Sequence, residues 1–244
     1  MKKIIFFAAI FVTSQLNANI ILHNTRVVFN EGHKEKTVRL HNNNSHPVLV
    51  QTWVDDGVQQ QIGNPPKTPF TILPPVFRME TQQGHILRVI YNGQSLPKDR
   101  ESIYWVNVFE VPPKDADLKD KNTLQIAFRT RIKLFFRPQS LTVPTTDQLA
   151  EKIECKISNH KNLTKTATLS CKNDSPYYIS FSKISLVENQ NNIPLSLDDI
   201  GMLNPFESSN TKIKLSQANG HHINTMIIND QGGVEEKNIK VIYE

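Results

Sequence analysis

Few side chains in this chain have the types and spacing that catalysis or metal binding needs. The sequence of 244 residues holds no glycine-rich phosphate loop, no His-Glu-x-x-His and no Gly-x-Ser-x-Gly motif. Its eight histidines are scattered, and the adjacent pair His221-His222 is expected in a solvated turn, because neighbours in a strand point to opposite faces. The sequence therefore predicts that the protein is not an enzyme and has no metal site and no cofactor.

Two cysteines, Cys155 and Cys171, are the remaining reactive groups. They lie sixteen positions apart in two β-rich runs joined by a polar stretch, so antiparallel pairing would bring them face to face. In an exported protein, a disulfide is the expected state of such a pair. Free buried thiols are the alternative, and a catalytic thiol has no supporting sequence context.

The N-terminal residues differ in composition from the rest of the chain. Lys2 and Lys3 precede the apolar run Ile4–Val12, and the small residue Ala18 follows, which is typical of a cleaved secretory signal. The run is too short to cross a bilayer, so we expect a signal peptide at residues 1–18 and no membrane insertion. The formal net charge of +5 would permit nucleic-acid binding, but export and the lack of an RNA-binding signature argue against it.

The elements that would position functional groups are predicted to be strands. Helical periodicity is almost absent, and short β-rich runs bounded by Asn, Gly, Pro and Asp recur instead. In the first half these runs are Thr37–His41, Val48–Val54, His85–Tyr91, Ile103–Val111 and Thr123–Phe136. In the second half they are Glu151–Ser158, Thr166–Lys172, Tyr177–Val187, Thr211–Leu215, Asn224–Ile228 and Ile239–Ile242.

Turn signals such as Asp55-Asp56-Gly57 separate these runs at spacings of roughly ten residues. The pattern indicates an all-β protein with sandwiches of the immunoglobulin type, and a barrel stays open as an alternative. The string between Pro138 and Pro144 predicts a short, stiff linker. We therefore expect an N-terminal domain at residues 19–139 and a smaller C-terminal domain at residues 140–244.

The segment Leu96–Pro113, which reads LPKDRESIYWVNVFEVPP, carries the most specific pattern. It resembles the signature of the periplasmic chaperones of the chaperone–usher pilus pathway, the PapD-like family. Other segments that resemble this family are Thr25–Phe29, Leu73–Met79, Ile132–Pro138, Asn173–Tyr178 and Ile228–Gly233. The resemblance implies two immunoglobulin-like β-sandwich domains set at an angle, like a boomerang. It also implies a periplasmic chaperone that binds, folds and caps pilus subunits and delivers them to an outer-membrane usher.

An alternation of apolar and polar residues runs from Leu124 to Phe136. Leu124, Ile126 and Phe128 share one face, and without other information half-burial in the protein's own core is the plain interpretation. The resemblance implies instead a donor strand, in which these three side chains fill a groove in the pilus subunit.

The resemblance also gives roles to five charged residues. Arg26 and Lys133 match two cations of the family that anchor the subunit's C-terminal carboxylate in the cleft between the domains. Glu101, Arg137 and Asp230 match a charged trio that bridges the two domains and holds their angle.

Three points stay open on the sequence alone. The stretch Lys114–Thr123 is expected to be a loop, and the short-loop branch of the family is favoured, because the chain shows neither a longer N-terminal extension nor a cysteine pair in the first domain. Self-association of the free chaperone through its exposed strand is a second open point. The alternative function is a pilus structural subunit or adhesin with immunoglobulin-like domains.

Overall fold

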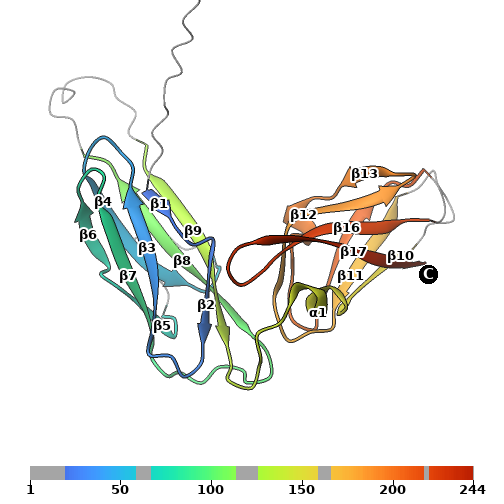
Figure 1. Ribbon diagram of the computed structural model, residues 1–244, viewed down its shortest axis with the longest axis horizontal. Coiled ribbons are helices and arrows are strands. Elements are labelled where there is room, and N and C mark those ends of the chain that lie inside the picture. The colour runs from blue at the N-terminus through green and yellow to red at the C-terminus, as the bar shows by residue number, and fades with distance from the viewer. Residues whose placement is uncertain (1–19, 59–66, 114–125, 159–165, 217–219, 244) are drawn as a thin grey trace, which may run out of the picture.

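The computed structural model describes residues 20–58, 67–113, 126–158, 166–216 and 220–243. These residues form two β-sandwich lobes that lie side by side at an angle (Figure 1). The first lobe packs around one apolar cluster that ends at Phe136, and the second lobe packs around another that begins at Leu149. The predicted all-β class with two immunoglobulin-like sandwiches is confirmed. Within the described ranges, no helix is long and apolar enough to cross a membrane.

The first lobe is a sandwich of two sheets. One sheet has the strand order β1 (Ile20–Leu22), β3 (Glu35–Asn42), β7 (Gly84–Tyr91) and β5 (Phe70–Leu73). The other has the order β2 (Arg26–Asn30), β9 (Phe128–Arg137), β8 (Ser102–Val111), β4 (Val48–Asp55) and β6 (Val76–Met79). Alternate side chains of both sheets face inward, as the period of two along a strand requires.

The chain changes sheets near its start, and this change leaves one edge of β9 free. Strand β1 pairs with β3, but after a short break β2 pairs in parallel with β9, beginning with Arg26 opposite Lys133. Residues Phe128–Ile132 of β9 pair with β8 on one side. On the other side they pair with no strand in the described part of the chain. That edge therefore presents unpaired backbone N–H and C=O groups.

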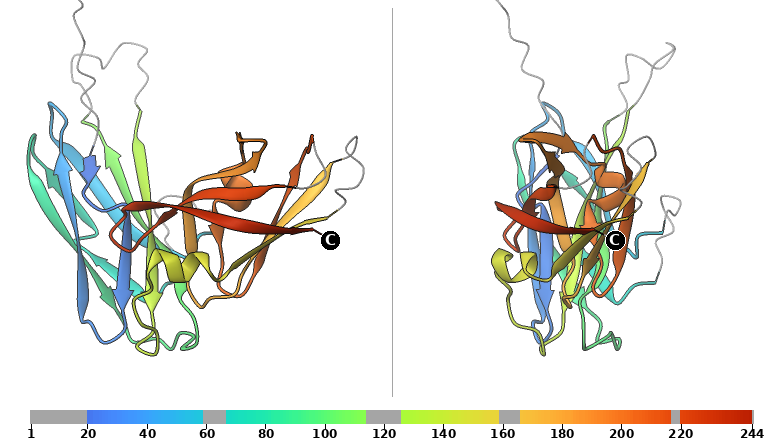
Figure 2. Two further views of the ribbon diagram at one scale, coloured as in Figure 1. Left: turned by 45° about the vertical axis from the view of Figure 1, so that its right-hand side comes forward. Right: turned by 90° about the vertical axis from the view of Figure 1, so that its right-hand side faces the viewer.

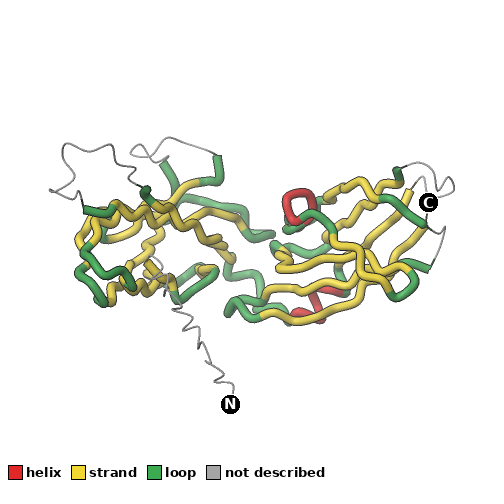
Figure 3. The backbone as a smooth tube through the Cα atoms, turned by 90° about the horizontal axis from the view of Figure 1, so that it is seen from above, coloured by secondary structure: helices red, strands yellow, loops and turns green. Residues whose placement is uncertain are grey.

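The second lobe contains the remaining strands and two short helices. Its sheet runs in the order β13 (Asn191–Pro194), β12 (Ile179–Glu188), β16 (His222–Ile228), β17 (Val234–Tyr243), β10 (Ile153–Ser158), β11 (Ala167–Asn173) and β15 (Ser208–Ile213), with β14 (Met202–Leu203) paired to β12. Figure 3 shows both helices, α1 (Thr146–Ala150) and α2 (Leu197–Ile200), in this lobe. Cys155 and Cys171 lie directly opposite each other on β10 and β11 and form a buried disulfide.

Several sequence-based boundaries need correction. Of the expected strand at residues 123–136, positions 123–125 lie outside the described ranges, and the described strand begins at Phe128. The expected strand at 151–158 begins at Ile153 and is preceded by α1, whose Thr145 cap accepts a hydrogen bond from the Gln148 backbone N–H. The expectation of a solvated turn at His221 is wrong, because its ring is buried between the Glu188 carboxylate and the Tyr243 hydroxyl. The predicted signal peptide at 1–18, Leu124 and the predicted loop at 114–123 lie outside the described residues.

One contact between the lobes is made by the turn between β16 and β17, which reaches toward the first lobe in Figure 1 and in the left view of Figure 2. Gly232, in this turn, has a φ of +87°, and a Cβ there would lie 2.3 Å from the Thr25 hydroxyl oxygen. Glycine is required at this position because both the backbone conformation and the close approach exclude a side chain. The contact brings the turn against the start of β2, where Arg26 lies.

Candidate functional site

Arg26 and Lys133 lie opposite each other on β2 and β9, at the point where the free edge of β9 ends. Both side chains point away from the first lobe's core and toward the second lobe. An Arg26 Nη1–H donates to the Ile228 carbonyl at 3.1 Å, and the Lys133 ammonium donates to the Ser180 hydroxyl at 3.2 Å. The Arg26 guanidinium also lies 5.5 Å from the centre of the Phe135 ring. Two cations from the first lobe are thus held in place by the second.

The electrostatics of this pair favour an incoming anion. Arg26 is only 8% exposed, and its Nε–H has no hydrogen-bond partner among the described residues. Burial, followed by the positive charge of Arg26, lowers the pKa of Lys133 from its ordinary value of 10.5 to about 8. Within the described ranges, neither cation forms an ion pair with a carboxylate of the chain. A carboxylate placed here would gain charge-assisted hydrogen bonds and relieve the repulsion between the two cations.

The free edge of β9 leads directly to these cations and carries an apolar face. Ile126 and Phe128 are 55% and 46% exposed, whereas Ile132, on the same face, is buried in the first lobe's core. This face therefore runs from the core to an uncovered end of β9, with the exposed Thr130 between Ile132 and Phe128. An exposed edge with apolar side chains at every second position can accept an added strand from another protein. Leu124, the third side chain predicted for this face, lies outside the described residues.

The opposite face of β9 is fixed by a cluster around Asp55 that the sequence analysis missed. The Asp55 carboxylate is 2% exposed and pairs with Arg129 at 3.0 Å and with Arg131. The Asn107 amide donates to the same carboxylate at 2.8 Å and accepts from Arg129 at 2.9 Å. Arg129 and Arg131 also lie over the rings of Trp53 and Trp105. These contacts attach β9 to β4 and β8 along the segment whose other edge is free.

Glu101, Arg137 and Asp230 come together between the lobes. The Arg137 Nε–H donates to Glu101 at 2.8 Å, and its two Nη groups donate to Asp230 at 2.6 and 2.9 Å. Glu101 also accepts from the Tyr178 backbone N–H at 2.9 Å. Burial raises the pKa of Glu101, against the opposing effect of Arg137. The network joins the end of β9 to the β16–β17 turn, which follows directly after Ile228 of β16, the carbonyl partner of Arg26.

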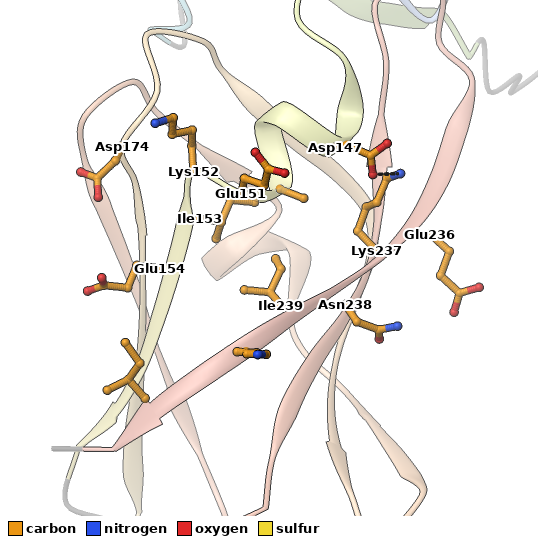
Figure 4. Close-up of a pocket in the computed structure, with 13 residues that line it drawn as sticks. Asp147, Glu151, Lys152, Ile153, Glu154, Asp174, Glu236, Lys237, Asn238 and Ile239 are labelled. Atoms are coloured by element: carbon orange, nitrogen blue, oxygen red, sulfur yellow. Dashed lines mark hydrogen bonds and ion pairs between the residues drawn. The ribbon is translucent and has the colours of Figure 1, made fainter.

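The hollows that border the second lobe include two of several hundred Å³. One, with a volume of about 460 Å³, opens beside Lys133. The other, with a volume of about 900 Å³, lies on the far side between α1, β10 and β17 (Figure 4). Its wall mixes charges of both signs, including an ion pair between Lys237 and Asp147 at 2.6 Å. This second hollow does not include Arg26, Lys133 or the free edge, so we give it no part in the site.

Comparison with known proteins agrees with the geometry. The family model described as "Pili and flagellar-assembly chaperone, PapD N-terminal domain" matches residues 19–142, and "Pili assembly chaperone PapD, C-terminal domain" matches residues 148–239. The chain is 38% identical to the "Probable fimbrial chaperone YadV" of Escherichia coli K12, over 97% of this chain and 95% of that protein.

Solved structures give the same result. The Pseudomonas aeruginosa CupB2 chaperone is 33% identical with a TM-score of 0.71, and the match covers 91% of this chain and all of that one. A chain from the complex of the Salmonella enterica SafA pilin with the SafB chaperone is 25% identical with a TM-score of 0.71, and the match covers 91% of this chain and 94% of that one.

Proposed function

The chain belongs to the PapD family of periplasmic pilus-assembly chaperones, a non-enzymatic family, and from that premise we propose that it captures pilus subunits on the free edge of β9. The protein is a pilus-assembly chaperone, and its partners are pilus subunits, as in the solved complex of SafA with SafB. Chaperone–pilin complementation is an established instance of strand addition to a sheet edge. What is proposed here is which residues of this chain perform it.

The observation that carries the proposal is the pair of cations at the end of the free edge, of which Arg26 is buried and Lys133 is half-buried. Arg26 and Lys133 are proposed to bind the C-terminal carboxylate of the subunit, which would supply the anion that the chain itself does not provide. Charge-assisted hydrogen bonds to a carboxylate are stronger than neutral ones, and a terminal carboxylate fixes the register of the strand that carries it.

The same geometry sets the direction of the captured strand. A strand added beside Phe128–Ile132 would occupy the line that β2 continues, because β2 takes over the same edge of β9 at Arg26. For its carboxylate to meet Arg26, the added strand must run from Phe128 toward Lys133, parallel to β9. Ile126 and Phe128, together with Leu124, are proposed to project into the groove of the subunit and cover apolar surface that would otherwise aggregate.

The charged network between the lobes is proposed to hold the cleft open at one angle. Glu101 and Asp230 bind Arg137, and Asp230 lies two residues after Ile228, whose carbonyl is the partner of Arg26. A buried network of this kind specifies geometry more than it adds stability. The proposed domain limits remain residues 19–139 and 140–244.

Three further assignments rest on the family and the sequence. Residues 1–18 are proposed to be a signal peptide that directs the chain to the periplasm. The loaded chaperone is proposed to deliver its subunit to an outer-membrane usher. The exposed face at Ile126 and Phe128 is proposed to allow self-association of the free protein, which light scattering of wild type and the Phe128→Ala variant would test.

Co-purification tests the proposal directly. The tagged protein is expressed in the periplasm together with its chromosomal neighbours, and a pilus subunit is expected to co-purify at equal stoichiometry. Arg26→Ala and Lys133→Ala should remove most of that subunit, since each loses a charge-assisted bond of roughly 1.5–3 kcal/mol. The double variant Ile126→Ala/Phe128→Ala should also lose the subunit.

The controls separate binding from folding. Arg39→Ala removes an exposed cation from the opposite sheet and should leave capture unchanged. Urea unfolding of the free Ile126→Ala/Phe128→Ala protein should show only a small loss of unfolding free energy. This loss should be far smaller than the 3–5 kcal/mol that truncating one buried Phe costs. Normal capture by both single cation variants would refute the carboxylate anchor. A stability loss of core size with normal capture would refute the donor strand.

A further inference from the structure

The hollow beside Lys133 lies where the outer face of the first lobe meets the second lobe. Its volume is about 460 Å³, enough for one large side chain. It is lined by Trp105, Lys133, Phe181, Leu197, Asp198 and Met202. The wall therefore combines apolar and polar surface in equal parts: one cation, Lys133 of the proposed carboxylate site, lies at one side, and the carboxylates of Asp198 and Asp199 lie at the rim.

One of the rim carboxylates is free to bind a partner. Asp199 accepts a hydrogen bond from the Thr211 hydroxyl at 2.9 Å, whereas the Asp198 carboxylate has no partner among the described residues. Leu197, next to it, is 46% exposed although its side chain is apolar. The rim therefore offers an uncovered apolar surface beside an exposed carboxylate that could accept a hydrogen bond from a partner.

We propose that this hollow receives the side chain of the subunit's last residue. It selects a large side chain with an apolar body and a hydrogen-bond donor at its tip, such as tyrosine. The inference rests on the proposed function, because it requires the subunit's terminal carboxylate at Arg26 and Lys133. Lys133 belongs to both sites, so a carboxylate bound to its ammonium places the last residue at the mouth of the hollow.

The distances within the sheet explain why a long side chain is required. Trp105 lies directly opposite Lys133, on the side of β9 away from the free edge. Neighbouring strands lie about 4.8 Å apart, so a strand added at the free edge runs about 10 Å from the Trp105 strand. A short side chain would not reach the hollow and would leave the apolar part of its wall in water. An acidic side chain would meet Asp198 and be repelled.

Trp105 provides a direct signal for occupancy. The chain has two tryptophans, Trp53 and Trp105, so Trp53→Phe leaves Trp105 as the sole fluorophore. The probe is a soluble synthetic peptide of alternating valine and threonine that ends in tyrosine, alanine or glutamate, each with a free carboxylate or an amide. A tyrosine's own emission is avoided by exciting only the indole.

The expected result is an order of affinities among the peptides that have a free C-terminal carboxylate. The peptide ending in tyrosine should bind about tenfold or more tightly than the one ending in alanine, as expected for burial of a large side chain. It should also shift the Trp105 emission. The peptide ending in glutamate should bind most weakly, and Asp198→Asn should reduce its deficit relative to alanine, since Asp199 remains at the rim. Asp174→Asn, an exposed acid beside the hollow of Figure 4, is the matched control and should change nothing.

A second variant tests the space itself. Leu197→Phe narrows the mouth of the hollow at an exposed position and adds no second indole, so it should abolish the advantage of tyrosine and leave the alanine peptide bound as before. The same last-residue substitutions, made in the subunit that co-purifies, should change its yield in the same order. If none of the short peptides binds, the yield of the co-purified subunit tests whether the hollow receives the last side chain.

The outcomes for the two proposals are distinct. If acids bind better than amides but the last side chain has no effect in either measurement, the hollow is not the subunit's side-chain site and the carboxylate anchor stands. If acids and amides bind equally, the carboxylate anchor itself is wrong, and the inference falls with it. A tyrosine advantage that survives Leu197→Phe would also overturn the inference.

Discussion

Subunit capture should weaken as the pH rises from 7 to 9, because the proposed anchor contains a lysine that loses its proton in this range. Burial and the charge of Arg26 lower the pKa of Lys133 to about 8 in the free protein. A bound carboxylate would stabilise the ammonium and raise this pKa again. Above pH 8, binding must therefore take up a proton.

The size of the effect follows from the fraction of charged lysine. With a pKa of about 8, about nine-tenths of Lys133 is protonated at pH 7 and about one-tenth at pH 9. The dissociation constant should rise about tenfold between these two values, which corresponds to about 1.4 kcal/mol. Titration of the chaperone with a peptide acid at a series of pH values, at constant ionic strength, measures this change.

Lys133→Arg is the matched control, since a guanidinium stays charged throughout this range. Its dissociation constant should be nearly constant from pH 7 to 9. Arg26→Ala removes the neighbouring positive charge, so it should raise the pKa of Lys133. Binding will be weaker overall, and the midpoint of the pH-dependent rise in the dissociation constant should lie at higher pH than in wild type. A flat wild-type profile, or an equal tenfold loss in Lys133→Arg, would show that Lys133 is not the titrating group.

The stability of the free protein should change in the opposite direction. The folded pKa of Lys133 lies below its ordinary value of 10.5, so the unfolded chain binds more protons between about pH 8 and 10.5. The contribution of Lys133 to folding stability must then rise with pH in this window. The difference in unfolding free energy between wild type and Lys133→Met, followed over this pH range, measures that contribution. Because stability rises with pH while capture weakens, the comparison shows that weaker capture does not come from unfolding.

Two further predictions concern elements that support the site. Denatured but unreduced protein should show no reactive thiol, and replacing Cys155 and Cys171 by serine should lower the unfolding free energy by roughly 3 kcal/mol for a loop of this length; two titratable thiols would contradict the disulfide. Asp55→Asn should lower the unfolding free energy by roughly 3 kcal/mol, because the substitution leaves Arg129 and Arg131 without their buried ionic partner. The same substitution should speed amide hydrogen exchange in β9. Wild-type exchange in β9 would show that the cluster does not hold the strand.

Sequence alternation predicts which side chains of β9 share a face, but not where that face leaves the core. Ile132 and Phe128 have the same orientation, yet Ile132 is buried and Phe128 is about half exposed. The difference arises because the first strand crosses to the other sheet between Leu22 and Arg26. No local pattern encodes that crossing, so the resemblance to a family was needed to predict an exposed donor face.

Asp55 shows a different limit of the sequence. Its place in Asp55-Asp56-Gly57 indicates a turn, and a backbone N–H of that turn does donate to its carboxylate. Its ion-pair partners, Arg129 and Arg131, lie more than 70 residues further along the chain. Spacing arguments cover only neighbours in sequence, so the alternating arginines of β9 could be predicted to share a face but not to share a buried acid.

The two cations of the cleft differ in a way that suits reversible capture. Arg26 lies near Asp230 and Glu101, which oppose the lowering of its pKa by burial, so it keeps its charge. Lys133 has no such support, since its pKa is lowered by burial and by Arg26. The acids that hold the two lobes together thus also maintain one cation, while the other is left with an unfavourable charge until an anion arrives. A chain that placed a carboxylate beside Lys133 would be more stable alone, but it would occupy the position that the subunit's carboxylate is proposed to take.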